Sequence, residues 1–218
     1  KYVAEEDVTG WELLWNEKYA GKILMFDNSR DAFGITQYML GYDVNTTDEA
    51  ELQHCADMLA QQKPVLQQYV MDQIFATMQN EEAWIAAYYA GDYLSMLDNQ
   101  ADNVDLQFVV PEEGSNWFVD AMCIPSCCQN QELAEIFINF MLSREVAIAN
   151  AEYIYYACPN SLVVEDEEYI EDMGEEAMEI LYPEMESFRE AYNTYAYRNL
   201  DPDTLGYISS LWEEIKIN

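Results

Sequence analysis

The fold is decided by residues 21–41, which read GKILMFDNSRDAFGITQYMLG. Its first part, 21–27, is a continuous apolar run after a glycine, which predicts a strand buried on both faces in a parallel sheet. A polar loop at 27–29 leads into a helix predicted over 30–40, and Gly41 ends that helix. This order indicates an α/β protein whose polar turn lies at the carboxyl end of a strand, where open α/β sheets bind their ligands.

Strands and helices continue along the rest of the chain. Further strands are predicted at 65–70, 83–89, 106–111 and 117–124. Further helices are predicted at 8–15, 48–61, 72–79, 93–98, 131–142, 144–155 and 203–215, with short acidic helices and loops at 165–190. Helix caps are expected at Thr9, at 45–47 and at Ser143. The final helix is amphipathic, and the side chains expected to point inward are Leu205, Ile208, Leu211, Trp212 and Ile215.

Acidic side chains dominate the composition, because 42 Asp and Glu against 9 Lys and Arg give a formal charge of −33. Such a field attracts cations and repels nucleic acid and anionic lipid, so no nucleic-acid partner is expected. The 218 residues are 50% hydrophobic, enough for a packed core in one large or two modest domains. No window approaches about 18 consecutive apolar residues, and the opening residues lack a signal-peptide pattern. Any export signal is therefore expected upstream of Lys1 or already cleaved.

Catalytic, metal and cofactor sites are not expected. The five cysteines support neither a disulfide framework nor, with the single His54, a zinc site; they are Cys55, Cys123, Cys127, Cys128 and Cys158. Cys123 is expected to point inward from a strand. His54 falls on the polar side of its helix, whose apolar stripe is formed by Leu52, Cys55, Ala56 and Leu59. The chain has no nucleophile elbow, no dinucleotide fingerprint and no phosphate loop, so an enzyme is not expected.

A second informative stretch is 116–125, which reads NWFVDAMCIP. It sets the rings of Trp117 and Phe118 beside the carboxylate of Asp120. Aromatic faces and an anionic oxygen both attract an organic ammonium ion, so this stretch predicts a cation-binding site. The alternative is that the aromatic residues belong to the core and Asp120 caps the end of a strand.

A set of ordered motifs resembles one family, the periplasmic spermidine/putrescine-binding proteins of polyamine ABC importers. The motifs run from about residue 8 to the final helix, and their order is specific although each alone is weak. They are VTGW at 8–11, DNSRDAFG at 27–34, LGY at 40–42, NTTD at 45–48, VPEEG at 110–114, WFVDAMCIP at 117–125, FINFMLSREVA at 137–147 and CPN at 158–160.

The resemblance implies a type II periplasmic-binding-protein fold, in which two α/β lobes are joined by crossover segments and close on a ligand. Residues 9–110 and 161–218 then correspond to a largely complete second lobe, and 117–158 to a returning portion of the first lobe. Crossover segments are expected at 1–8 and 108–120. The opening part of the first lobe has no counterpart, so the apolar faces of the helices at 131–142 and 144–155 would lack the sheet they cover in the family.

The resemblance also implies the ligand-binding residues. Two family carboxylates on the turn after the first strand match Asn28 and Asp31, and Asn28 keeps an acceptor but loses a charge. An aromatic near the end of another strand matches Tyr89. The aromatic before the crossover carboxylate matches Phe118, with Trp117 next to it, and the carboxylate matches Asp120.

The expected function is that of an extracytoplasmic solute-binding protein that captures a polyamine and delivers it to an ABC importer. Its partners would be the polyamine, the permease subunits and the missing first-lobe segment. Its location would be the periplasm, or a lipid anchor on the outer face of the cell membrane. Asn28 favours a shorter or shifted polyamine or weaker binding, and leaves both putrescine and spermidine open. The alternatives are the same fold binding another small cation or organic solute, and an acidic interaction protein without a transport role.

Overall fold

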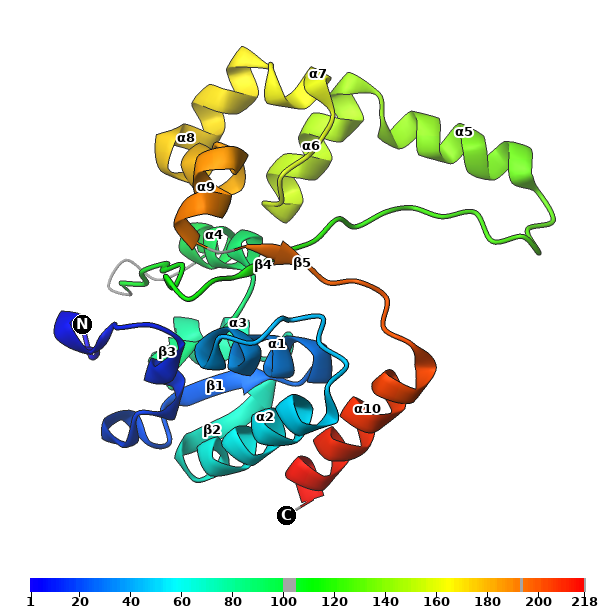
Figure 1. The fold of residues 1–218 in the computed structure, drawn as a ribbon. Helices are drawn as coiled ribbons and strands as arrows, with labels where there is room; N and C mark the ends of the chain where they lie inside the picture. The colour runs from blue at the N-terminus through cyan, green and yellow to red at the C-terminus, as the bar shows by residue number, and fades with distance from the viewer. Residues whose placement is uncertain (100–104, 193, 218) are drawn as a thin grey trace. The chain divides into compact units, whose positions relative to one another are not determined.

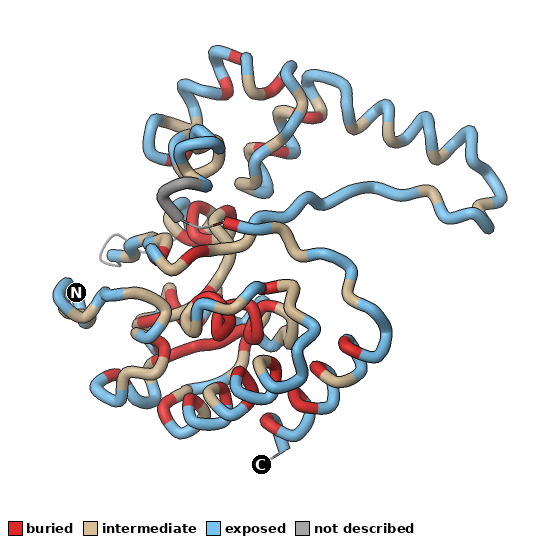
Figure 2. Tube along the Cα trace, viewed as in Figure 1, coloured by how far each residue is buried: buried red, intermediate tan, exposed pale blue. Residues whose placement is uncertain are grey.

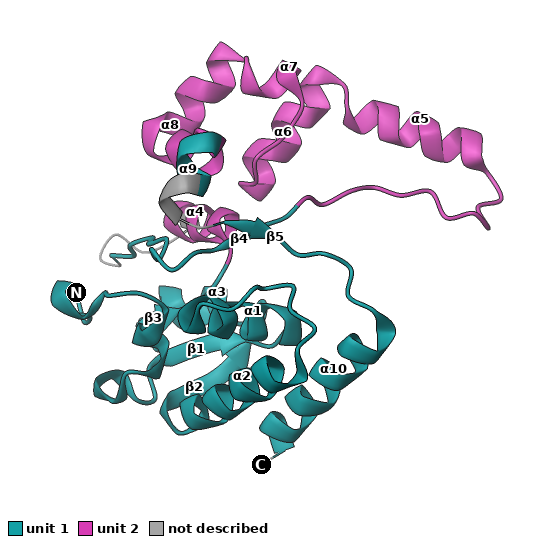
Figure 3. Ribbon diagram, in the orientation of Figure 1, with its two compact units in different colours: residues 1–88, 100–118, 186–218 teal, residues 89–99, 119–185 magenta. Residues whose placement is uncertain are grey.

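The computed structural model describes residues 1–99, 105–192 and 194–217, which form two compact units (Figure 3). Unit 1 comprises residues 1–88, 100–118 and 186–218, and unit 2 comprises residues 89–99 and 119–185. Residues 89–99 and 161–185, which the family resemblance assigns to the second lobe, are therefore grouped with 119–160 in unit 2. None of the described helices is long and apolar enough to cross a membrane.

Unit 1 is built on a parallel sheet of strand order β2-β1-β3 (Figure 1). The central strand, β1 (Ile23–Phe26), is buried along its whole length, as the apolar run predicts. It pairs with β2 (Leu66–Val70) on one side and β3 (Ile85–Ala86) on the other. The prediction for β1 is confirmed and that for β2 is nearly so, whereas β3 covers only two residues of the predicted 83–89.

Helices pack around this sheet, with buried side chains concentrated on β1 and α1 (Figure 2). They are α1 (Ser29–Leu40), α2 (Glu49–Gln62), α3 (Ile74–Gln79) and α10 (Pro202–Ile217), with short 3-10 helices at Glu5–Asp7, Trp11–Trp15, Glu17–Tyr19 and Lys63–Val65. The helix predicted at 8–15 is thus a 3-10 helix, and its cap is Gly10 rather than Thr9. Gly41 ends α1 in a left-handed conformation, with φ of 72°.

Two details of these helices differ from expectation. The cap of α2 is Asp48, whose carboxylate accepts from the backbone of Ala50 and Glu51, and not the residues at 45–47. Leu205 is 44% exposed, although the other apolar residues expected to point inward from α10 are buried. Two residues further along α10, Tyr207 donates a hydrogen bond to Gln53 of α2.

The predicted strands at 106–111 and 117–124 are mostly wrong. The described residues 105–115 form no strand, and only Asn116–Trp117 do so, as β4, which pairs in parallel with β5 (Tyr195–Ala196). An extended segment without a neighbouring strand cannot satisfy its backbone groups in a ladder and leaves them to water. Accordingly, Val119, Met122 and Cys123 are exposed, and Cys123 does not point inward.

Unit 2 consists of helices. They are α4 (Ala90–Asn99), α5 (Gln131–Met141), α6 (Arg144–Ile154), α7 (Ser161–Val164) and α8 (Glu167–Leu181), which is broken at Gly174; α9 (Met185–Tyr192) begins at the boundary with unit 1. The core of unit 2 is formed by Ala147, Ala151, Val163 and Tyr169. The apolar face of α6, which was expected to lack the sheet that it covers in the family, is therefore partly covered by α7 and α8.

The apolar face of α5 remains exposed. Leu133, Ile136, Phe137 and Phe140 are each more than half exposed, and the rest of the helix is exposed or partly so. A contiguous apolar face of this kind normally marks a surface that another segment or chain covers. The sequence-based expectation for 131–142 is confirmed in this respect.

A pH-sensitive contact links α6 and α8 within unit 2. Asp166 caps α8 by accepting from Tyr169 N at 3.1 Å, and Arg144 also donates to its carboxylate. The hydrogen bond from the Tyr169 backbone, with help from Arg144, lowers the pKa of Asp166 below its ordinary value. Since folding lowers this pKa, Asp166 stabilises unit 2 above its unfolded pKa of about 3.9, and the stabilisation is lost as the pH falls through the folded value.

We therefore expect Asp166→Asn to destabilise unit 2 at pH 7, and the difference from the parent protein to shrink as the pH falls through the lowered pKa of Asp166. Urea unfolding across this pH range, followed by circular dichroism, measures the difference. Glu168→Gln, an exposed neighbour in the first turn of α8, is the matched control and should change stability little across this range. A pH-independent difference for Asp166→Asn would contradict the prediction.

Candidate functional site

The turn that connects β1 to α1 holds two of the predicted site residues together. Asn28 is the N-cap of α1, and its Oδ1 accepts from Arg30 N at 2.8 Å and Asp31 N at 3.4 Å. Asp31 lies in the first turn of the helix and is buried. This turn, residues 27–31, lies at the carboxyl end of the central strand, as predicted. We call it the ligand turn after its predicted role.

Arg30 is a residue of the ligand turn that the sequence analysis missed. Its guanidinium lies 4.6 Å from the centre of the Tyr197 ring, and its Nη2 donates to Asn45 Oδ1 at 3.0 Å. Burial lowers the pKa of Arg30 from its ordinary value, although Tyr197 and Asp31 partly oppose the shift. Arg30 thus places a half-buried cation beside Asp31.

The remaining carboxylate of the turn, Asp27, accepts a hydrogen bond from the Lys216 ammonium of α10. The same ammonium lies 6.0 Å from the centre of the Tyr69 ring and 5.9 Å from that of Trp212. Asp27 and Asp31 are therefore balanced by Lys216 and Arg30. As a result, the ligand turn contributes little net negative charge.

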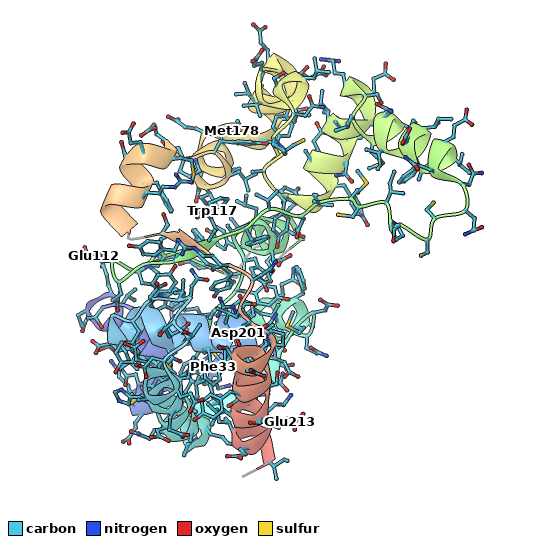
Figure 4. The ribbon with its side chains drawn as sticks, turned by 45° about the vertical axis from the view of Figure 1, so that its right-hand side comes forward. Phe33, Glu112, Trp117, Met178, Asp201 and Glu213 are labelled. Carbon is cyan, nitrogen blue, oxygen red and sulfur yellow. The ribbon has the colours of Figure 1, made fainter. Side chains whose placement is uncertain are left out.

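Trp117, which is labelled in Figure 4, is the last residue of β4, and Phe118 follows it. Both belong to unit 1, and both side chains are exposed. The guanidinium of Arg189, on α9, lies 5.2 Å from the centre of the Trp117 ring. A cation thus already occupies one of the rings that the sequence predicts to bind a cation. The role of this ring toward a ligand cation stays a prediction.

Tyr89 and Asp120 belong to unit 2. Tyr89 is partly buried just before α4, where its carbonyl accepts from Tyr93 N at 3.3 Å. Asp120 is exposed on the extended segment that follows β4. The structure thus brings Asn28 and Asp31 together and places Trp117 beside Phe118, and the convergence of all six residues on one ligand stays a prediction.

One hydroxyl and one amide, from α1 and the loop after it, bind the segments around β4 and β5, and the sequence analysis missed both. Tyr38 donates to the Ser115 carbonyl at 2.6 Å and accepts from Tyr195 N at 3.3 Å, and burial raises its pKa to about 12. Asn45 was interpreted as part of a helix cap. Its side chain instead donates to the Ala196 carbonyl at 3.1 Å. The only sequence signal for this contact is the position of Asn45 in a polar loop. The contact itself could not be predicted, because its partner lies 151 residues away.

Other features of the described residues do not add to this site. They contain no group of three or more His, Cys, Asp or Glu side chains that could hold a metal ion. Cys55 is buried, and its pKa is raised to about 12 by burial. Two surface grooves of unit 1 have volumes of about 470 and 510 Å³, but neither is lined by a predicted site residue.

The family match and the fold define the class of binding protein to which the chain belongs. Residues 6–173 match a family model described as bacterial extracellular solute-binding protein, and the chain belongs to this family. A similar curated protein is the spermidine/putrescine-binding periplasmic protein of Escherichia coli K12, which is 31% identical over 158 residues. A norspermidine sensor of Vibrio cholerae is 28% identical over 144 residues.

Solved structures give the same fold, periplasmic-binding-protein-like. A chain described as a spermidine/putrescine ABC transporter from Listeria monocytogenes is 34% identical, with a TM-score of 0.83 over 96% of this chain and 62% of that chain. The substrate-binding protein PotD of Streptococcus pneumoniae, solved with calcium and HEPES, is 32% identical, with a TM-score of 0.75 over 98% of this chain and 63% of that chain. The match to the Escherichia coli protein covers 72% of this chain but 44% of the relative, so the chain spans less than half the length of that relative.

Proposed function

We propose that this chain is part of an extracytoplasmic solute-binding protein that captures a polyamine and delivers it to an ABC importer. The observation that carries the proposal is the similarity to a relative named for binding spermidine and putrescine, at 31% identity over 158 residues. Binding and release involve no bond making, so we propose no enzymatic activity. Periplasmic relatives support a location outside the cytoplasm, in the periplasm or anchored to the outer face of the membrane.

The residue chemistry is consistent with this ligand class. A protonated diamine needs an anionic or polar partner at each end, because an ammonium ion buried without partners costs several kcal/mol. Asp120 would hold one ammonium, and the ligand turn with Asn28 and Asp31 would receive the other end. The rings of Tyr89, Trp117 and Phe118 would line the methylenes between them.

The proposal implies two protein partners. Permease subunits of an importer would receive the loaded protein, and a first-lobe segment would cover the exposed apolar face of α5. The relatives extend well beyond the stretch they share with this chain, which leaves room for such a segment. A formal charge of −33 makes nucleic acid an unfavourable partner.

Asn28→Asp tests whether the ligand reaches the turn. In the complete protein we expect tighter binding of both putrescine and spermidine, with the larger gain for the more highly charged spermidine. An added carboxylate acts only on an ammonium within about 4–6 Å, since water and salt screen longer contacts. Asp caps a helix about as well as Asn, so the free energy of unfolding should change little.

Isothermal titration calorimetry with both amines measures the effect. The matched control is Asp48→Asn, which makes the reverse exchange at the cap of α2 and should leave affinity unchanged. Unchanged affinity in Asn28→Asp would show that the ligand does not reach the turn. A thermal-shift panel in which another small cation or an organic solute stabilises the parent protein, and no polyamine does, would overturn the proposed function.

A further inference from the structure

Asn45 lies in the loop after α1, and its side-chain amide joins segments that are far apart in the sequence. Its Oδ1 accepts from Arg30 Nη2 at 3.0 Å and from the backbone N of Arg198 at 2.6 Å. Its Nδ2 donates to the Ala196 carbonyl at 3.1 Å. One partly buried amide therefore holds both the ligand turn and the segment that contains β5.

The amide is chemically matched to these partners. It accepts from two donors and donates to one carbonyl, which a carboxylate of the same shape cannot do because it has no donor. Arg30 also depends on it, since Arg30 Nη1 is buried and has no hydrogen-bond partner among the described residues. Loss of the Asn45 oxygen would leave a half-buried guanidinium with still fewer partners.

From Asn45 the contacts continue in two directions. On one side, the backbone N of Arg30 donates to Asn28 Oδ1 at 2.8 Å. On the other side, Ala196 is the partner of Trp117 in the β4–β5 pair. All of these residues belong to unit 1, so the connection from Asn28 to Trp117 lies within one compact unit.

Tyr197 strengthens the same connection. Besides the contact of its ring with Arg30, its hydroxyl lies against Gly34, where a Cβ atom would come within 2.0 Å of the oxygen. The segment 195–198 is thus seated closely on the first turns of α1. Little freedom remains for the ligand turn to shift relative to β4.

We propose that Asn45 is a positioning residue for the amine site. It fixes the ligand turn relative to the Trp117 and Phe118 end of β4 and does not itself contact the ligand. Its effect on affinity rests on the proposed function. Its effect on the position of Trp117 is a property of unit 1 that requires no ligand.

The test uses Asn45→Asp and Asn45→Ala in the complete protein labelled with 5-fluorotryptophan, with the Trp117 resonance assigned by Trp117→Phe. Both variants are expected to shift the ¹⁹F resonance of Trp117 in the absence of ligand and to weaken putrescine binding about ten-fold. The matched control is Gln62→Ala, which removes another buried amide of unit 1. Gln62 Nε2 donates to the Leu14 carbonyl at 3.1 Å, away from the ligand turn.

Gln62→Ala is expected to lower the stability of unit 1 while leaving the Trp117 resonance and the affinity unchanged. An unshifted Trp117 resonance in Asn45→Asp, a shift of equal size in Gln62→Ala, or wild-type affinity in Asn45→Asp would each overturn the proposal. If Asn45→Ala does not fold, the nearly isosteric Asn45→Asp decides. If the parent protein binds no amine, the proposed function fails, and the ligand-free Trp117 resonance still decides whether Asn45 positions β4.

Discussion

Replacing Asp120 with alanine in the complete protein is expected to weaken polyamine binding by about 2–5 kcal/mol, the range for breaking a desolvated charge pair. This large value is expected because Lys216 pairs with Asp27, and the charge of Arg30 interacts with that of the neighbouring Asp31. The turn can therefore contribute hydrogen bonds and shape but little net charge. Asp120 is left to supply the dominant charge contact to a ligand ammonium.

Isothermal titration calorimetry with putrescine and spermidine measures this loss. Asp172→Ala is the matched control, since it removes one exposed carboxylate from α8 of the same unit. In a protein of formal charge −33 the general field changes little with one residue, so the control should bind almost as tightly as the parent. Near-wild-type affinity in Asp120→Ala would remove it from the site, and equal losses in both variants would point to the general field instead.

The second large effect concerns α5. The 218 residues by themselves are expected to bind polyamines at least about a hundred-fold more weakly than the complete protein, because a two-lobed binder gains affinity by closing both walls on its ligand. We also expect the chain alone to self-associate through the apolar face of α5. Calorimetry and sedimentation velocity measure the two effects.

Two double variants distinguish the effect of the exposed apolar side chains of α5 on self-association from the effect of the charge of the helix. Ile136→Lys with Phe140→Lys should make the chain monomeric, because both side chains lie on the exposed apolar face. Glu132→Lys with Glu135→Lys also makes α5 more basic but leaves these apolar side chains in place, so it should preserve self-association. Micromolar polyamine binding by a demonstrably monomeric chain would contradict the prediction and require a site built from these 218 residues alone.

The sequence was sufficient for features determined by local patterns. The apolar run at 23–26 and the stop at Gly41 each act within a few residues, and each was found. The strands at 106–111 and 117–124 were predicted from apolar content alone, but a strand also needs a neighbour, which such a pattern does not reveal. The exposed face of α5 was anticipated only through the family resemblance.

The residues of the candidate site show the same difference between local features, which the sequence predicts, and long-range contacts, which it does not. Asn28 and Asp31 lie on one local turn after β1, as the sequence indicated, and their part in ligand binding stays a prediction. The contact that balances Asp27 was missed because it crosses a long stretch of chain: Lys216 is 189 residues from Asp27. Asn45 was misassigned for the related reason that capping is the common role of a polar residue before a helix, whereas the partners of its side chain are Arg30, Ala196 and Arg198.

The close approach of Tyr197 to Gly34 sets a limit on engineering this protein for thermal stability. Glycine inside a helix costs roughly 1 kcal/mol relative to alanine, so Gly34 in the middle of α1 is the kind of position that consensus or propensity-based design would change. The tyrosine hydroxyl occupies the space that a methyl group would need. A gain in helix propensity at this position would therefore displace the aromatic ring on which Arg30 rests.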